Sequence, residues 1–259
     1  MKQEKVIFFG NGPLAEYALA VIERECQVVF HARTKEDLAR AVEFKQKYPE
    51  AHGILASYGV MVPSAVLKAF EPEGILNIHP SLLPLNRGAS PIESAILAGD
   101  KEFGVSVMKL VRAMDAGPLY HQMNITDIIF DKDWLYRHLA EAGAEWIVAN
   151  LAKLPEPTPQ EGEPTFCGKF EKKDGALNPK TDSAEMIFRK IVAFQGFPKP
   201  KYAFYGVPCT ILEAHLPEQG EKALLTIPCA DGRAVVVTRL QPEGRKAMDA
   251  KSFINGYAR

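Results

Sequence analysis

The apolar residues of the N-terminal part form short continuous runs, which are separated by stretches of helical spacing. The runs are KVIFFG at 5–10, QVVFHA at 27–32, GILASYG at 53–59 and GILNI at 74–78. A continuous apolar run is typical of a parallel strand that is covered on both faces. Residues 14–25 and 34–48 repeat their apolar positions with the period of a helix. This alternation predicts an α/β fold with a Rossmann-like, mainly parallel sheet and helices on both faces.

The composition and the apolar pattern of the chain change after an amphipathic stretch at 133–154. Residues 155–176 are rich in Pro, Gly and charge, which is typical of a linker. Beyond them a helical stretch at 183–193 precedes four β-rich runs at 202–208, 209–216, 223–228 and 234–240. Short strands at this spacing predict a small β-barrel. We therefore expect a first domain at 1–154, a linker at 155–176 and a second domain at 177–259.

Charge is divided unevenly between the two expected domains. The whole chain has a net charge of −1, but residues 177–259 hold 12 Lys and Arg against 8 Asp and Glu, a net charge of +4. A basic second domain is suited to a polyanion. Hydrophobic residues make up 47% of the chain, which excludes a disordered protein. No apolar run has the ~20 residues of a membrane-spanning helix, and the N-terminus lacks the pattern of a signal peptide, so we expect a cytoplasmic protein.

Residue spacing disfavours two common kinds of site. Four cysteines, at 26, 167, 209 and 229, are scattered without CxxC pairs, so we expect neither a metal site nor a disulfide framework. Gly10-Asn11-Gly12 follows the first strand, but Ala15 replaces the third glycine of a dinucleotide-binding fingerprint. No acidic residue closes the second strand either. We therefore expect no nicotinamide cofactor.

Three polar residues are candidates for chemistry. Asn77 and His79 lie two positions apart at the end of an apolar run, so their side chains point to the same side of the strand. Ligands of open α/β sheets bind beyond the carboxyl ends of the strands. Asp115 lies in a later loop, where a carboxylate can orient an imidazole. A strand-end histidine and an aspartate before Ala-Gly also fit purely structural roles, so this pattern alone leaves the function open.

Longer motifs around these residues resemble the folate-dependent formyltransferases, and the resemblance covers the whole chain. The motifs are Asn77-Ile78-His79-Pro80, Ser81-Leu82-Leu83-Pro84, Arg87-Gly88-Ala89, Pro91-Ile92 and Gly99-Asp100, followed by Met114-Asp115-Ala116-Gly117. The resemblance implies that Asn77, His79 and Asp115 are the catalytic set. It also implies 10-formyltetrahydrofolate as the formyl donor, with no metal. The residues implied around the folate are Ile75, Leu76, Ser81, Leu82, Leu83 and Pro84, with Ile75 and Leu76 approaching it partly through backbone groups.

Within that family, three segments are similar to the members that formylate the methionine on charged initiator tRNA. They are RGASPIESAILAGD at 87–100, SAEMIFRKIVAFQGFPKPKYAFYG at 183–206 and LQPEGRKAMDAKSFINGYA at 240–258. The resemblance implies a second domain built as an OB-fold-like barrel that binds tRNA, and it indicates neither a membrane nor an obligate protein partner. The tRNA contacts that it implies are Arg87, Gly88, Arg189, Arg245 and Lys246.

The sequence departs from these relatives between the second and third strands. Family members usually carry a long basic loop and an extra helix–strand segment there, whereas this chain has only residues 31–53, with Arg33, Lys35 and Arg40 as possible substitutes. Two alternatives therefore stay open, a sugar-nucleotide N-formyltransferase and a non-catalytic nucleic-acid-binding protein on the same scaffold. The intact set of Asn77, His79 and Asp115 argues against the non-catalytic alternative.

Overall fold

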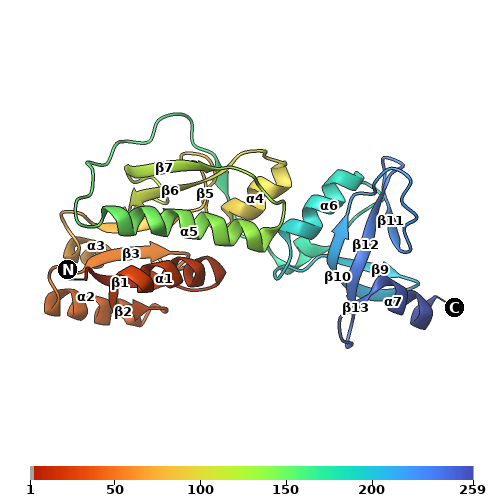
Figure 1. Ribbon diagram of the computed structural model, residues 1–259, viewed down its shortest axis with the longest axis horizontal. Helices are drawn as coiled ribbons and strands as arrows, with labels where there is room; N and C mark the ends of the chain where they lie inside the picture. Colours follow the sequence, from red (N-terminus) through yellow and green to blue (C-terminus); the bar gives the residue numbers. More distant parts are fainter. Residues whose placement is uncertain (1–2, 259) are drawn as a thin grey trace. The chain divides into compact units, whose positions relative to one another are not determined.

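The computed structural model describes residues 3–258, which form two compact units. The first unit contains the chain up to Ile92 together with Lys101–Gly168, and the second contains Glu93–Asp100 together with the chain from Lys169 onward. Figure 1 labels the helices and strands of both units. Within the described residues no helix combines the length and the apolar composition needed to cross a membrane.

The first unit is built on a six-stranded mixed sheet with the order β2-β1-β3-β4-β6-β7. Strands β2, β1, β3 and β4 run parallel, as the alternation of the sequence predicts, whereas β6 and β7 are antiparallel to their neighbours. The short connection between β6 and β7 accounts for their antiparallel pairing, because only a long crossover could return the chain for a parallel pairing. The strands span Lys5–Gly10 (β1), Gln27–Ala32 (β2), His52–Ala56 (β3), Ile75–His79 (β4), Phe103–Lys109 (β6) and Leu119–Ile125 (β7).

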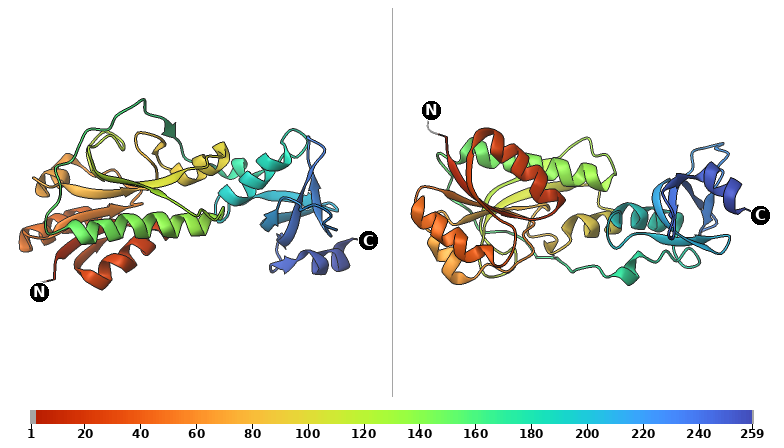
Figure 2. Two further views of the ribbon diagram at one scale, coloured as in Figure 1. Left: turned by 45° about the horizontal axis from the view of Figure 1, so that its top comes forward. Right: turned by 90° about the horizontal axis from the view of Figure 1, so that it is seen from below.

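Helices cover both faces of this sheet (Figure 2). Alternate strand residues such as Ile7 and Phe9 pack with Leu38 and Val66 into one apolar core. The other face is covered by α1 and α5, which pack against each other. A Cβ added to Gly143 of α5 would touch Ile78 of β4, so this helix lies close against the strand that carries Asn77 and His79. The helices are α1 (Pro13–Glu25), α2 (Asp37–Lys47), α3 (Ser64–Ala69) and α5 (Lys132–Asn150).

The residues expected as a linker are divided between the two units. Residues 155–168 belong to the first unit, where Phe166–Cys167 form β8 and pair in parallel with β5 (Arg87–Gly88). Thr158 also exchanges backbone hydrogen bonds with Leu119 of β7. These bonds provide the partners that a Pro- and Gly-rich segment cannot supply for itself. Only residues 169–176 of the expected linker belong to the second unit.

The second unit has its own apolar core and its own antiparallel sheet. The strand order is β11-β12-β10-β9, with β13 paired to β12. Ile187 and Ile191 of α6 pack with strand residues such as Ile211 and with Phe253 of α7. The elements are α4 (Pro91–Ala98), which begins in the first unit, α6 (Ala184–Ala193), β9 (Lys201–Phe204), β10 (Val207–His215), β11 (Thr226–Pro228), β12 (Ala234–Pro242), β13 (Met248–Asp249) and α7 (Ala250–Tyr257).

Candidate active site

Asn77 and His79 lie at the carboxyl end of β4, an inner strand hydrogen-bonded to β3 and β6. Each residue is only 5% exposed. Their side chains share one side of the strand because strand residues alternate in direction. No hydrogen bond of the Asn77 side chain occurs among the described residues. Among the described residues every fully buried side-chain N or O atom has a partner, so the unbonded amide of Asn77 retains contact with solvent and is available to a ligand that enters the site.

The imidazole of His79 lies between two acceptors. Its Nε2 is 3.1 Å from the carbonyl oxygen of Asn86, and its Nδ1 is 3.7 Å from Oδ1 of Asp115. A bond to the carbonyl requires the proton on Nε2, so we assign the neutral tautomer whose Nδ1 carries a free lone pair. Burial lowers the pKa of His79 below its ordinary value of 6.5, although Asp115 and the Asn86 carbonyl each act to raise it. At neutral pH the imidazole is therefore uncharged and able to accept a proton at Nδ1.

Asp115 lies in the loop between β6 and β7 and reaches the site in an unusual backbone conformation. Its φ angle is +47°, a left-handed value that residues other than glycine adopt only at an energetic cost. One carboxylate oxygen faces His79, and the other, Oδ2, accepts a 2.8 Å hydrogen bond from the backbone N–H of Gly88. Asp115 thus connects the catalytic histidine candidate with the short strand β5.

The loop Ser81–Pro84 is held by polar residues of the two antiparallel strands. Ser106 of β6 donates to the carbonyl oxygen of Ser81 at 2.6 Å and accepts from the N–H of Leu83 at 3.1 Å. Gln122 of β7 donates to the carbonyl oxygen of Leu83 at 2.8 Å. The hydroxyl of Ser81 itself donates to the carbonyl oxygen of Leu85. This loop is therefore rigidly placed, and the hydroxyl proton of Ser81 is already used within it.

The residues expected around the folate differ in their access to a ligand. Ile75 and Leu76 are 0% and 1% exposed, because β4 is covered on both faces. The carbonyl oxygen of Ile75 also accepts from the N–H of Leu110. Leu83 is likewise buried, whereas Leu82 and Pro84 keep part of their surface exposed. Of the expected set, Leu82 and Pro84 offer apolar surface, and the side chains of Ile75 and Leu76 belong to the core.

The residues expected at the acceptor fall into three groups. Arg87 and Gly88 lie beside Asp115, and the Arg87 guanidinium donates to Oε1 of Gln160. Arg189 donates to the carbonyl oxygen of Ala98, where α4 ends, and pairs with Glu185, so its guanidinium has partners within the second unit. Arg245 and Lys246 are exposed in the turn between β12 and β13.

Several residues that hold the site carried no signal in the sequence. Gln160 and Thr165 lie in the segment expected as a linker, yet Gln160 bonds to the Asp115 loop and Thr165 bonds to Asn86. Ser106 and Gln122 occur within ordinary strand patterns. Each of these four acts through side-chain bonds to residues distant in the sequence, which local patterns do not reveal. Among the described residues no group of three or more His, Cys, Asp or Glu side chains is placed to hold a metal ion.

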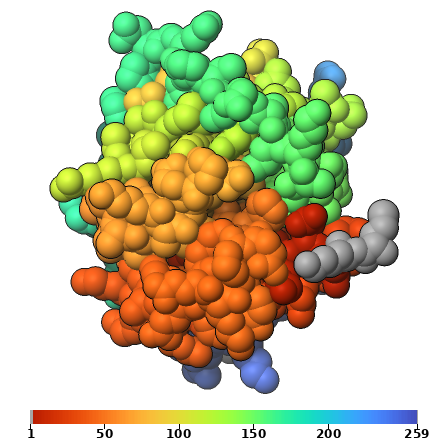
Figure 3. Space-filling view, turned by 90° about the vertical axis from the view of Figure 1, so that its left-hand side faces the viewer, coloured from red at the N-terminus to blue at the C-terminus, as the bar shows by residue number. Residues whose placement is uncertain are grey.

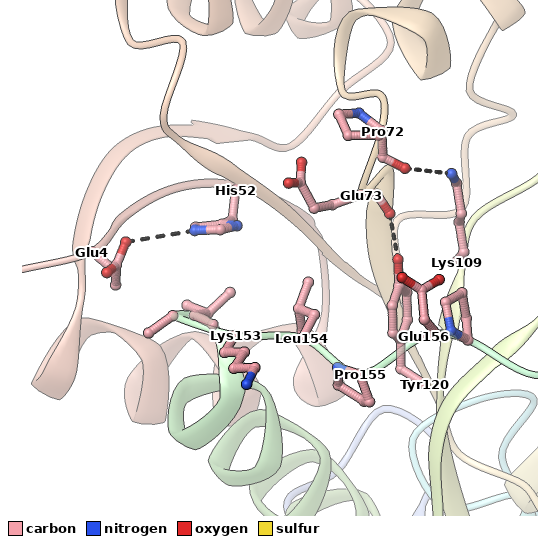
Figure 4. Close-up of a pocket in the computed structure, with 13 residues that line it drawn as sticks. Glu4, His52, Pro72, Glu73, Lys109, Tyr120, Lys153, Leu154, Pro155 and Glu156 are labelled. Atoms are coloured by element: carbon pink, nitrogen blue, oxygen red, sulfur yellow. Dashed lines mark hydrogen bonds and ion pairs between the residues drawn. The ribbon is translucent and has the colours of Figure 1, made fainter.

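A polar hollow of about 500 Å³ opens at the other end of the sheet, where its parallel strands begin. Figure 4 shows His52 facing Glu4, Lys109 bonded to the carbonyl oxygen of Pro72, and Tyr120 donating to that of Glu73. Figure 3 looks onto this side of the first unit, with α2 and α3 in orange and the residues after α5 in green. The hollow is remote from Asn77 and His79, because it lies where β1, β3 and β4 begin rather than where they end.

Comparison with known proteins assigns both halves of the chain to one family. The family model described as formyl transferase matches residues 14–151, and the model described as formyl transferase, C-terminal domain, matches residues 169–258. Methionyl-tRNA formyltransferase of Thermus thermophilus is 36% identical over 257 residues, which cover 95% of this chain and 82% of that protein.

Two solved structures share the fold at lower identity. Methionyl-tRNA formyltransferase from Clostridium thermocellum superposes with a TM-score of 0.69 at 17% identity, covering 93% of this chain and 99% of that one. HypX from Aquifex aeolicus in complex with tetrahydrofolic acid superposes with a TM-score of 0.74 at 19% identity, covering 100% of this chain and 48% of that one.

Proposed function

Since this chain belongs to the formyl transferase family, we propose that it transfers a formyl group from 10-formyltetrahydrofolate to the α-amine of methionine carried by initiator tRNA. Such a product supports translation initiation, and the proposed location is the cytoplasm. The observation that carries the proposal is the arrangement of Asn77, His79 and Asp115 at the carboxyl end of β4. An amide with no hydrogen-bond partner among residues 3–258, a neutral imidazole and a carboxylate meet there.

These three side chains cover the needs of acyl transfer between two nitrogens. When the amine attacks, a bond forms between its nitrogen and the formyl carbon, and the formyl oxygen becomes negative. The amide of Asn77 donates a hydrogen bond to this oxygen, a contribution typically worth about 3 kcal/mol. His79 accepts the proton of the amine at Nδ1 and returns it to N10 of the folate as the old C–N bond breaks. Asp115 then lies beside the charged imidazolium and stabilises it.

The surface beside Asn77 and His79 fits a flat, partly apolar donor. Leu82 and Pro84 keep part of their side chains exposed on a loop that Ser106 and Gln122 hold in place. Ligand pockets usually combine such apolar walls with a few fixed polar groups. We place the folate against Leu82 and Pro84, and we assign Ile75, Leu76 and Leu83 the role of buried support for this wall.

The second unit supplies the contacts to the tRNA in this proposal. We propose that residues 177–259 form an OB-fold-like barrel with a tRNA-binding role, and that residues 155–168 complete the catalytic part. Arg245 and Lys246 are exposed cations in one turn, which suits them to phosphate contacts that fix position without reading bases. Arg189 is not included, because its guanidinium already caps α4.

One observation favours a second candidate, a sugar-nucleotide N-formyltransferase. The chain between β2 and β3 contains a single helix, α2, and lacks the long basic loop expected of a tRNA enzyme. Such an enzyme would use the same Asn77, His79 and Asp115. The two candidates therefore differ only in the acceptor.

The test is a competition among acceptors. The protein would be incubated with 10-formyltetrahydrofolate and, in separate reactions, with initiator tRNA charged with methionine, an amino-sugar nucleotide and glycinamide ribonucleotide. We expect formylation of the charged tRNA, and uncharged tRNA serves as the control. Formylation of the amino sugar alone would transfer the assignment to the second candidate, and His79→Ala would establish in either case that the observed turnover belongs to this site.

A further inference from the structure

Gln160 is a half-buried residue in a stretch of exposed chain, and its side chain points at the loop that carries Asp115. Its Nε2 donates two hydrogen bonds of 2.8 Å, one to the carbonyl oxygen of Asp115 and one to that of Gly117. Its Oε1 accepts from Nε and Nη2 of Arg87, at 3.1 and 2.6 Å. Both amide hydrogens and the amide oxygen are therefore in use.

These bonds close a ring around the carboxylate of Asp115. Gln160 holds the backbone of Asp115, the side chain of Asp115 accepts from Gly88, and Arg87, the neighbour of Gly88, returns to Gln160. The loop needs such support because Asp115 has a φ of +47°. A conformation of this kind persists only where the surroundings enforce it.

We propose that Gln160 is a positioning residue for catalysis, which fixes Asp115 relative to His79 by holding the carbonyl groups of Asp115 and Gly117. The inference rests on the proposed function, because it assigns Gln160 to the same site. Gln160 itself does not touch the reacting atoms. Its effect on turnover passes through the Asp115 loop, whose displacement by about 1 Å can cost ~100-fold in rate.

Two substitutions separate the bonds that Gln160 makes. Gln160→Ala removes all of them. Gln160→Glu keeps an acceptor for Arg87 but replaces both donors with an oxygen that repels the two carbonyl groups. Asn150→Ala is the matched control, because Asn150 also donates a 2.8 Å side-chain bond to a backbone carbonyl in the first unit, at a distance from the site.

The first measurement is formyl transfer at saturating donor and acceptor. We expect both Gln160 variants to lose at least ~10-fold in kcat, a loss within what misplacement of a catalytic group produces, while the Kd for 5-formyltetrahydrofolate changes less than twofold and the control keeps its kcat. In an Asp115→Asn background, Gln160→Ala should have no further effect on kcat, since the group that it positions is already impaired. An equal loss in both backgrounds, or a loss of folate binding parallel to the loss of kcat, would overturn the proposal.

The second measurement requires no acceptor, so it stays decisive even if the proposed function fails. It is the pKa of His79, followed by NMR in the folded wild-type protein and in its Gln160→Ala variant. The groups that face this imidazole are the carboxylate of Asp115, which acts to raise its pKa, and the carbonyl of Asn86. If Gln160 positions Asp115, the pKa of His79 falls in Gln160→Ala, which introduces no new charge near the imidazole. An unchanged His79 pKa would overturn the inference, whereas a wild-type protein that formylates no acceptor would overturn only the proposed function.

Discussion

Nδ1 of His79 lies 3.7 Å from Oδ1 of Asp115, a separation too long for a hydrogen bond and short enough for a strong electrostatic effect. Their side chains are only 6% and 14% exposed, so little water screens the interaction. The carboxylate therefore acts mainly on the charged form of the imidazole. Burial of the imidazole disfavours its charged form and outweighs the effect of Asp115, so the pKa of His79 lies below its ordinary value.

The Asp115→Asn variant tests this balance through the pH dependence of kcat/KM. The base form of His79 is needed for transfer, so wild-type activity should fall as the pH drops through the pKa of His79, below 6.5. Removal of the carboxylate charge removes an influence that raises this pKa. The acidic limb should then move to lower pH while the plateau falls by ~100-fold. A limb that stays in place or moves to higher pH would contradict the assignment of His79 as the base.

Alanine substitution tests whether His79 and Asn77 act in catalysis rather than in folding. His79→Ala should lower kcat by at least ~100-fold, as loss of a general base does. Asn77→Ala should lower it by ~100- to 1,000-fold through the unsupported oxyanion. His52→Ala is the control and should retain full kcat, because His52 lies where β3 begins, at the other end of the same sheet. Turnover near that of the wild type in either variant would remove that residue from the mechanism.

Gly88 tests whether the pairing of β5 with β8 is needed for activity. Its φ is +129°, and an added Cβ would collide with the carbonyl oxygen of Cys167. Gly88→Ala should therefore separate the two strands, weaken the bond from Gly88 to Asp115 and lower kcat by at least ~10-fold. Gly168→Ala is the control, because a Cβ there meets no atom within 4 Å. Equal kinetics of the two variants would show that the pairing is dispensable.

The acceptor assignment is tested by charge reversal in the second unit. Arg245→Glu combined with Lys246→Glu should raise KM for charged tRNA more than it lowers kcat, since phosphate contacts contribute equally to ground and transition states. The effect should shrink at high salt, because each neutralised phosphate releases counterions on binding. Lys222→Glu combined with Lys251→Glu, two exposed cations elsewhere in the unit, gives the same change in net charge as a control.

A truncation provides the complementary measurement for the acceptor. A chain ending at Gly175 keeps β8 and Gln160, so it should bind folate while losing most of its affinity for charged tRNA. If the full-length protein binds charged initiator tRNA no better than this truncation does, the tRNA assignment fails and the amino-sugar acceptor becomes the leading candidate.

The sequence predicts the parallel half of the first sheet well, because apolar runs such as KVIFFG and GILNI record burial on both faces. The common direction of Asn77 and His79 follows from the alternation of strand residues alone. The position of Asp115 does not, since it depends on a loop held by Gln160 and Gly88. The folate residues inferred from resemblance include Ile75 and Leu76, whose complete burial is evident only once β4 is known to be an inner strand.

Residues 155–168 show why composition alone was insufficient. Pro, Gly and charge are typical of linkers, and most of this segment is indeed exposed. Its order comes from a few long-range bonds, of Gln160 to the Asp115 loop and of Thr165 to Asn86. Arg189 is the converse case, because a lone basic residue gave no sign that its guanidinium ends on the carbonyl of Ala98.

Because β8 follows the whole first sheet along the chain, we expect the site to be completed after the sheet during synthesis. All six strands of the first sheet and α5, which ends at Asn150, leave the ribosome before Phe166 and Cys167 do. Domains generally fold as they emerge, so the sheet can form while the loop at Asn86–Gly88 still lacks its neighbour. We expect a nascent chain whose Thr165 has not yet left the ribosome to hold the folded sheet with Asn77 and His79 in place, while Asn86 still lacks its hydrogen bond to Thr165. We therefore expect catalytic competence to follow the folding of the sheet.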